Sequence, residues 1–300
     1  MVKKIKIIFL GTSANIPSAS RNHSGTLLVY NEENILVDCG EGIQRQFRTA
    51  KLNPCKVTRI LITHKHLDHI LGLPGLLATF SLSGYNKTLF IYGPKGIKKF
   101  LDGILDALEF KREYKVKIEE VSGKFFESND FYLEAEAMNH RVPCNAYNFI
   151  LKEQRRINKE KLLKSKLPAG PLLQKIKQGK NVFYQGKKYS AKRLIYLEEG
   201  KKISFVLDTS FHKKIIKFAE NADVFVCESS FSEDMKNHAK EHLHLTSKQA
   251  GEIAKKAKVK KLFLTHISQR YEKNAKPLLD DAKKIFKNIK IAKDFDVVEV

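Results

Sequence analysis

Residues 58–69 read Thr-Arg-Ile-Leu-Ile-Thr-His-Lys-His-Leu-Asp-His, an apolar stretch that runs directly into three histidines and an aspartate. The first six residues are mostly β-branched or apolar, which predicts a buried strand. His64 and His66 are one residue apart, so both rings can face one ion from an extended turn. Asp68 and His69 can then face a neighbouring site. This density of imidazole and carboxylate groups favours a borderline metal; the alternative is a basic loop with incidental histidines.

Three further candidate ligands each follow a predicted strand, as the histidine cluster does. They are His140 after the strand at 131–137, Asp208 after the strand at 203–207, and His266 after the strand at 261–265. Taken singly, each residue has the alternative role of a capping or hydrogen-bonded group. Because strand ends on one edge of a sheet converge, the three together predict more ligands for the same centre.

Predicted strands and helices are interspersed in both halves of the chain, which indicates a layered α/β sandwich rather than a doubly wound sheet. No short-period repeat occurs, which argues against a solenoid. Besides the strands named above, the spacing of apolar residues predicts strands at 4–10, 25–30, 34–37 and 88–92, and helices at 41–49, 70–82, 96–108 and 246–256.

The chain has 300 residues and is strongly basic, with 55 Lys and Arg against 33 Asp and Glu, a formal charge of +22. Such a charge indicates a polyanionic partner or, alternatively, only a lysine-rich surface. No apolar run approaches the ~18 residues of a membrane helix, and no secretory pattern occurs. We therefore expect a cytoplasmic protein without a membrane partner. The four cysteines are far apart, which predicts reduced thiols.

The segment at 152–193 differs from the rest of the chain in composition. It contains 14 Lys and Arg against two Glu, a net charge of +12, and it is interrupted by prolines and glycines. It is predicted to be an arm inserted into a single catalytic domain that spans 1–300. Such an arm can neutralise the phosphates of a folded RNA without contacting its bases. The alternative is a disordered lysine-rich loop.

The histidine cluster together with His140, Asp208 and His266 resembles the ligand set of the metallo-β-lactamase superfamily. Other motifs along the whole chain narrow the resemblance to the tRNA 3′-processing endoribonucleases, the ribonuclease Z family. They are Phe9-Leu10-Gly11-Thr12, Pro17-Ser18 with Arg21-Asn22, Asp38-Cys39-Gly40-Glu41-Gly42 with Gln44-Arg45-Gln46, Pro168-Ala169-Gly170-Pro171, His244-Leu245-Thr246 with Gln249-Ala250, and Leu264-Thr265-His266-Ile267-Ser268 with Arg270-Tyr271.

The resemblance implies a four-layer αββα metallo-β-lactamase sandwich and two Zn²⁺ per subunit. The first zinc would be held by His64, His66 and His140, the second by Asp68, His69 and His266, with Asp208 bridging the two. Paired metals suit phosphodiester hydrolysis, because they activate water and stabilise both the attacking and the leaving oxygen. Leu67, Ala146 and Leu207 stand where the family usually has glycine, and we expect them to alter loop packing only.

The resemblance also implies catalytic roles outside the ligand set. Asp68 is the candidate general base, and His244 resembles the family's non-ligand histidine that protonates the leaving O3′. Glu228 is a candidate partner of His244, or alternatively a solvated loop carboxylate. His242 lies nearby, but the spacing to Thr246 favours His244. Three other histidines are expected at the surface: His23, His212 and His238.

The function implied is endonucleolytic removal of the 3′ trailer from precursor tRNA, which leaves a 3′-hydroxyl on the tRNA and a 5′-phosphate on the trailer. The expected partners are precursor tRNA and a second copy of the chain in a homodimer, and no DNA is expected. Expected substrate contacts are Arg21, Asn22, Pro168, Gly170, Pro171, Lys175, Lys177 and Arg270. The alternatives are a small-molecule hydrolase or phosphodiesterase of the same fold and a non-catalytic RNA-binding protein.

Overall fold

The computed structural model describes residues 4–107 and 113–300, and two seven-stranded sheets dominate it. The first sheet is antiparallel from β18 to β3 and parallel from β3 to β6. Its strands, in spatial order, are β18 (Val297–Glu299), β1 (Lys6–Gly11), β2 (Gly25–Tyr30), β3 (Glu33–Val37), β4 (Arg59–Leu61), β5 (Leu89–Gly93) and β6 (Val116–Glu120).

The second sheet is parallel from β17 to β14, and its other strands follow one another along the chain. Its strands, in spatial order, are β17 (Ile289–Ile291), β16 (Leu262–Thr265), β15 (Val224–Glu228), β14 (Lys201–Val206), β9 (Cys144–Leu151), β8 (Phe131–Met138) and β7 (Gly123–Glu127). The candidate ligands His140, Asp208 and His266 follow β8, β14 and β16, so they lie at strand ends as predicted from the sequence.

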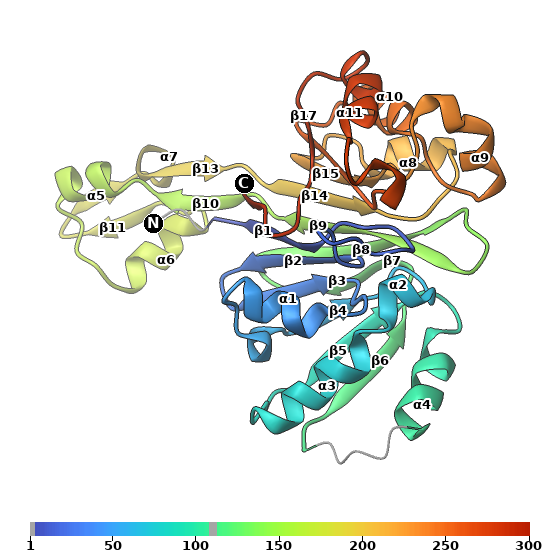
Figure 1. The fold of residues 1–300 in the computed structure, drawn as a ribbon. Helices are drawn as coiled ribbons and strands as arrows, with labels where there is room; N and C mark the ends of the chain where they lie inside the picture. The colour runs from blue at the N-terminus through green and yellow to red at the C-terminus, as the bar shows by residue number, and fades with distance from the viewer. Residues whose placement is uncertain (1–3, 108–112) are drawn as a thin grey trace. The chain divides into compact units, whose positions relative to one another are not determined.

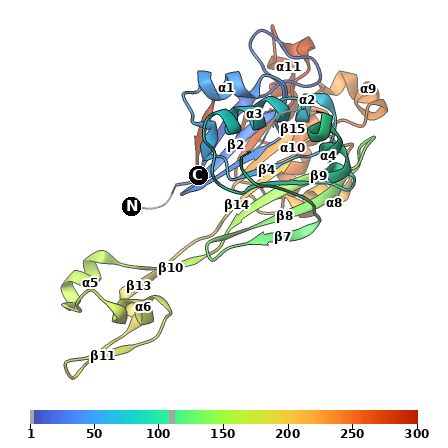
Figure 2. The ribbon, with the colours of Figure 1, turned by 90° about the horizontal axis from the view of Figure 1, so that it is seen from below.

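Helices cover the outer face of each sheet. Those on the first sheet are α1 (Ile43–Thr49), α2 (Leu67–Ile70), α3 (Leu73–Leu82) and α4 (Ile97–Ala107). Those on the second are α8 (Lys213–Phe218), α10 (Ser247–Lys256) and α11 (Lys276–Lys283), and α9 (Lys236–Glu241) and the 3₁₀ turns η1 (Pro54–Lys56), η2 (Glu233–Met235) and η3 (Gln269–Tyr271) lie in connections. Figures 1 and 2 show this order of layers, which confirms the predicted αββα sandwich.

The inner faces of the two sheets pack against each other through aromatic side chains. The rings of Phe9 in β1 and Phe263 in β16 have centroids 5.5 Å apart. Tyr147 in β9 donates its hydroxyl to the carbonyl of Ile62 at 2.7 Å, directly after β4. The contact of Tyr147 joins the strand that precedes the histidine cluster to the second sheet, so ligands from both sheets can meet.

Several predicted helices differ from the structure at their ends, and the helix predicted at 41–49 begins at Ile43 in α1. The helix predicted at 70–82 is two helices, α2 and α3, with Gly72 between them. The helix predicted at 96–108 is α4, and Leu108 lies outside the described residues. Within the described ranges, no helix combines the length and apolar composition needed to cross a bilayer.

The chain divides into two compact units, and the smaller consists of Glu127–Tyr132 and Ile150–Lys201. This unit contains all residues of the predicted arm at 152–193. Its elements are β10 (Gln154–Ile157), α5 (Lys159–Ser165), α6 (Pro171–Lys177), β11 (Val182–Tyr184), β12 (Lys187–Tyr189), α7 (Ala191–Leu194) and β13 (Ile195–Glu198). Strand β10 pairs antiparallel with β13, and strand β11 pairs antiparallel with β12.

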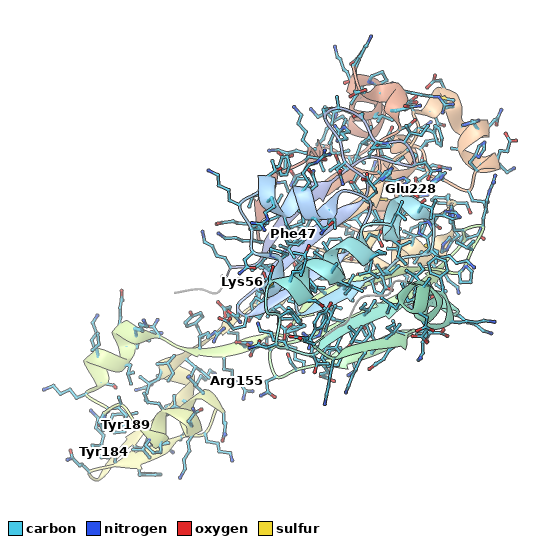
Figure 3. The ribbon with its side chains drawn as sticks, turned by 60° about the horizontal axis from the view of Figure 1, so that its bottom comes forward. Phe47, Lys56, Arg155, Tyr184, Tyr189 and Glu228 are labelled. Atoms are coloured by element: carbon cyan, nitrogen blue, oxygen red, sulfur yellow. The ribbon has the colours of Figure 1, made fainter. Side chains whose placement is uncertain are left out.

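The smaller unit has a hydrophobic core of its own. The core consists of Leu167, Ile176, Val182, Tyr189, Ala191 and Leu194, with Tyr184 among the partly buried side chains packed on it. Figure 3 labels Tyr184 and Tyr189 within this unit, together with Arg155. The expected contacts Pro168, Gly170, Pro171, Lys175 and Lys177 are all exposed, so each is available to a ligand.

Two glycines allow the histidine cluster to approach the end of β3. A Cβ on Gly72 would lie 2.0 Å from the carbonyl oxygen of Gly40, and a Cβ on Gly40 would lie 2.4 Å from the carbonyl oxygen of Asp68. Gly72 also donates its N–H to the carbonyl of Cys39 at 2.9 Å. The obstructing atoms are backbone atoms, which cannot rotate away as a side chain can.

We expect Gly72→Ala to lower the free energy of unfolding by about 1–3 kcal/mol, since the added methyl group forces the two backbone segments apart. Urea denaturation measures the change. Gly103 in α4 is the matched control, because nothing lies within 4 Å of a Cβ built there. Gly103→Ala should be neutral or stabilise the helix by up to about 1 kcal/mol. Equal stability of the two variants would contradict this account.

Candidate metal centre

The histidine cluster changes from extended to helical backbone in its middle. After β4 the chain bends at Lys65 and His66, and His66 is the N-cap residue of α2 with φ −69° and ψ 149°. Asp68 and His69 lie in the first turn of α2 and are buried. This change of backbone direction separates the two pairs, so each pair faces a different group of partners.

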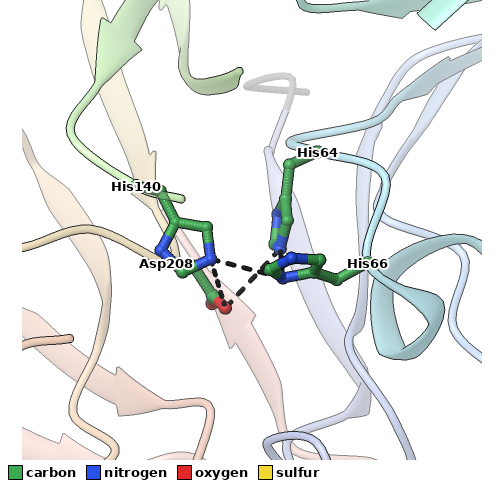
Figure 4. Close-up of side chains that lie close together, drawn as sticks. All are labelled: His64, His66, His140 and Asp208. Carbon is green, nitrogen blue, oxygen red and sulfur yellow. Dashed lines mark hydrogen bonds and ion pairs between the residues drawn. The ribbon is translucent and has the colours of Figure 1, made fainter. Parts of the chain in front are cut away.

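Seven side chains form two groups, and within each group the donor atoms lie within 4.8 Å of one another. The first group, shown in Figure 4, is His64, His66, His140 and Asp208. The second group is Asp68, His69, Asp208 and His266. All seven residues predicted as ligands from the sequence are therefore brought together, and Asp208 belongs to both groups.

Asp208 faces the two groups with different oxygens. Its Oδ2 lies 3.6 Å from Nε2 of His64 and 3.9 Å from Nε2 of His140. Its Oδ1 lies 3.5 Å from Nε2 of His69 and 3.1 Å from Nε2 of His266. The residue is only 1% exposed, and among the described residues Oδ1 has no hydrogen-bond partner. A buried carboxylate between two sets of ring nitrogens is the arrangement of a bridging ligand.

The ring nitrogens also face one another closely enough to favour bound cations. Nε2 of His64 lies 2.9 Å from Nδ1 of His66, and Nε2 of His69 lies 3.2 Å from Nε2 of His266. Burial, together with the neighbouring histidines, lowers the pKa of His64, and burial lowers the pKa of His66 and His140. Neutral imidazoles present the lone pairs that a metal requires. The donor set therefore fits divalent ions with nitrogen and oxygen ligands.

The carboxylates of both groups remain ionised. Burial by itself raises the pKa of Asp68, but the charge of His69 and hydrogen bonds with His266 and His69 outweigh it and hold that pKa far below the usual range. The pKa of Asp208 is lowered as well, because His266 and His69 outweigh the effect of burial. Both side chains can therefore act as anionic ligands at neutral pH.

Asp38 is not one of the candidate ligands, but it orients His69 of the second group. Its Oδ2 lies 2.5 Å from Nδ1 of His69, and it accepts the backbone N–H and the hydroxyl of Thr63. The aspartate is fully buried, so this contact fixes the ring of His69, whose Nε2 would be the atom that holds an ion. Sequence reasoning quoted Asp38 in a family motif but gave it no role, although it directly follows a strand, as Asp208 does.

Other histidines of the centre are held in the same way through their second ring nitrogen. Ser230 Oγ lies 2.9 Å from Nδ1 of His266, and Thr63 Oγ1 lies 3.1 Å from Nδ1 of His64. The carbonyl of Leu243 lies 3.3 Å from Nδ1 of His140. Sequence reasoning missed Ser230 and Thr63 as supporting residues, because single hydroxyl residues carry no distinctive spacing.

His244 lies beside the centre and contacts Glu228, the partner proposed for it from the sequence. Nδ1 of His244 lies 3.0 and 3.1 Å from the two oxygens of Glu228. The carboxylate is fully buried at the end of β15 and also accepts the N–H of Thr209 and the hydroxyl of Ser230. Burial lowers the pKa of His244, but Glu228 and Asp208 outweigh it and raise the pKa to about 9. His244 is therefore protonated at neutral pH.

A cavity of about 250 Å³ opens beside these residues. His244 and His266 line it, together with Phe231, His238, His242 and Arg270. The loop that contains Asn15 and Ile16 closes another side. Arg270, an expected substrate contact, is exposed and lies over the ring of Phe231 at 5.6 Å. The cavity thus combines a protonated imidazole, a guanidinium group and access to the second ligand group.

Two expected substrate contacts are structural instead. Arg21 is 9% exposed, and its Nη1 donates to the hydroxyl of Thr12 and the carbonyl of Ala292, each at 2.6 Å. Asn22 is 7% exposed and donates its side-chain amide to the carbonyl of Glu41 at 2.7 Å. The prediction that they meet the RNA is corrected here, because both side chains are buried in internal hydrogen bonds that shape the loop.

The three histidines expected at the surface are half-buried. Nε2 of His23 lies 3.1 Å from the carbonyl oxygen of Asn15. His212 is the N-cap residue of α8. His238 packs its ring against Phe231, with centroids 5.0 Å apart. Their burial follows from long-range packing that the sequence around each histidine does not indicate.

We expect Asp208→Asn to reduce the zinc content of the protein, because the substitution removes the charge that faces both ligand groups. Elemental analysis after dialysis measures the zinc bound per chain. Asp280→Asn is the control, since Asp280 is an exposed carboxylate in α11. Retention of all bound zinc by Asp208→Asn would contradict the bridging assignment.

Comparison with known proteins places this geometry in a family. The family model described as Anti-Pycsar protein Apyc1 matches residues 5–157, so this half of the chain belongs to that family. A ribonuclease Z of Listeria monocytogenes is 40% identical, with 99% of each chain covered, and a ribonuclease Z of Archaeoglobus fulgidus is 37% identical, with 98% of this chain and 97% of the relative covered.

Solved structures agree with the sequence comparison. The structure of human tRNase Z, short form, is 26% identical to this chain, superposes with a TM-score of 0.71 and covers 98% of both chains. The resemblance stated from the sequence motifs is therefore confirmed. Because the chain is 40% and 37% identical in sequence to two curated ribonucleases Z over almost its full length, it belongs to the ribonuclease Z family.

Proposed function

We propose that the protein is a zinc-dependent endoribonuclease that removes the 3′ trailer of precursor tRNA and leaves a 3′-hydroxyl on the tRNA. Family membership supports the tRNA-processing activity. The observation that carries the catalytic part is the pair of ligand groups joined by Asp208, with protonated His244 beside them. Two Zn²⁺ per chain and the homodimer belong to the proposal and come from the resemblance. The cytoplasmic location also belongs to the proposal, and it comes from the pattern of apolar residues in the sequence.

Two residues of the chain each carry out one proton transfer during the hydrolysis. When bound, paired zinc ions lower the pKa of water and stabilise charge on the phosphate oxygens. Asp68, an ionised member of the second group, accepts the proton of the water that attacks phosphorus. As the bond from phosphorus to O3′ breaks, His244 donates its proton to that oxygen. Glu228 stabilises the charged imidazole before the transfer and fixes the ring orientation.

The smaller unit supports recognition of a folded RNA. The segment at 152–193 has a net charge of +12, and Lys175 and Lys177 are exposed on α6. Exposed lysines on a folded scaffold suit contact with phosphates in a shape-recognised RNA.

We expect His244→Ala to slow cleavage of a 3′-extended precursor tRNA by about 10²–10⁴-fold, the usual contribution of a general acid. Hydrolysis of bis(p-nitrophenyl) phosphate should fall far less, because p-nitrophenolate leaves without protonation. Single-turnover rates on both substrates measure the difference. Asp68→Ala is the comparison variant and should lose both activities. Equal losses for His244→Ala on the two substrates would contradict its role as an acid.

The Glu228→Gln variant should change how cleavage depends on pH. The pKa of His244 is raised to about 9 in the folded protein, so cleavage of precursor tRNA should decline as pH rises through this value. Without the carboxylate of Glu228 the protonated imidazole is less stable, and the decline should move to lower pH. A pH–rate profile of kcat between pH 6 and 10 (roughly the range that brackets both values) measures the shift. A pH–rate profile that does not move would mean that Glu228 has no influence on the proton transfer from His244.

Neutralising two lysines on the smaller unit tests its role without removing its core. Lys175→Gln together with Lys177→Gln should weaken precursor tRNA binding and lower the salt dependence of log Kd by about 1 for each phosphate left without its lysine. Hydrolysis of bis(p-nitrophenyl) phosphate should be unchanged. The matched control replaces Lys283 and Lys287, two exposed lysines of the larger unit, by Gln. Equal weakening of RNA binding in both double variants would argue against a dedicated arm.

A further inference from the structure

A third group of possible metal ligands lies outside the two groups that share Asp208. His238, Glu241 and His242 place their donor atoms within 4.8 Å of one another. The three residues come from α9 and its C-cap position. None of them belongs to the seven-residue centre, and none has a role in the proton transfers described above.

The backbone of α9 places the two histidines on one face. The N–H of His242 donates to the carbonyl of His238 at 3.1 Å, which continues the helical pattern to the C-cap residue. Residues four apart on a helix are neighbours on its surface, and the two ring centroids are 4.3 Å apart. Glu241 is three residues after His238 and lies on the same face.

The chemistry of this triad is that of a zinc site. Two imidazoles at positions i and i+4 of a helix, joined by one carboxylate, make a recognised zinc donor set. The carbonyl end of a helix also carries partial negative charge, which favours a cation.

The principal opposing charge is Arg141. Its Nη2 lies 3.4 Å from Nδ1 of His242 and 3.2 Å from the carbonyl of Glu241. Arg141 is exposed, so its side chain has room to turn away from an arriving ion. Its guanidinium group therefore weakens cation binding without blocking the position.

The triad also lies on the wall of the cavity beside the centre. His238 and His242 line that cavity together with His244 and Arg270. An ion held by the triad would occupy part of a space of about 250 Å³. This placement links occupation of the triad to access of a phosphodiester to the centre.

We propose that His238, Glu241 and His242 bind a third divalent cation of the zinc class, separate from the two-ion centre. An ion at this site restricts the cavity, so zinc in excess slows phosphodiester hydrolysis. The second statement rests on the proposed function, whereas the existence of the site does not.

The test compares zinc binding by the full-length chain and by the double variant with His238→Ala and His242→Ala. Equilibrium dialysis against Zn²⁺ followed by elemental analysis should show one zinc fewer per chain in the variant. The decisive quantity is this difference of one, whatever the content of the other two groups. His212→Ala is the control for incidental histidine binding and should bind as many ions as the unmodified chain. Equal binding by the double variant and the unmodified chain would overturn the site.

A second variant is expected to strengthen zinc binding at the site, and its result does not depend on whether the double variant folds. Arg141→Gln removes the positive charge next to His242, so it should lower the dissociation constant of the weakest zinc. An unchanged dissociation constant would also count against the triad as the location of that ion.

The effect on hydrolysis is measured separately with bis(p-nitrophenyl) phosphate. For each protein, the rate with excess zinc is divided by the rate at the zinc concentration that gives maximal activity. The ratio should be lower for the unmodified chain than for the double variant, and equal ratios would overturn the restriction of the cavity. If neither protein hydrolyses bis(p-nitrophenyl) phosphate or cleaves a 3′-extended precursor tRNA, the proposed function fails, and the zinc count still decides the site.

Discussion

The buried carboxylate of Asp208 is the constraint on which the rest of the site depends. It is 1% exposed, and each oxygen faces two ring nitrogens, from His64 and His140 on one side and His69 and His266 on the other. A buried charge is costly unless opposite charges or hydrogen bonds compensate it. The four histidines and the ions they can hold supply that compensation, so they must converge on one carboxylate.

The fold provides this convergence because the ligands come from the ends of strands in both sheets. The histidine cluster follows β4 of the first sheet, whereas His140, Asp208 and His266 follow strands of the second. The contact from Tyr147 to the carbonyl of Ile62 joins the two sets close to the cluster. The close approach of Gly40 and Gly72 then brings α2 against the end of β3, where Asp38 can orient His69.

Sequence reasoning worked where several chemically distinctive residues stand close together or at strand ends. The density of histidines at 64–69 identified the centre, and the strand-end rule added His140 and Asp208. The same reasoning passed over Ser230, because a serine is common in every loop. It also assigned Arg21 to the RNA, because a cation in a loop near the site gives no indication that Thr12 and Ala292 accept its hydrogen bonds internally.

The sequence by itself determined which donor groups the protein has, their order along the chain and the placement of +12 of its charge at 152–193. These properties depend only on residue type and on spacing along the chain, so the sequence is sufficient to determine them. Only the tertiary structure decided how the ligands divide between the oxygens of Asp208, that Glu228 pairs with His244, and that His238 and His242 share the wall of a cavity with His244. The division of the ligands at Asp208 depends on contacts between segments far apart in sequence. The other two relations depend on how burial and packing place the loops and helix after β15.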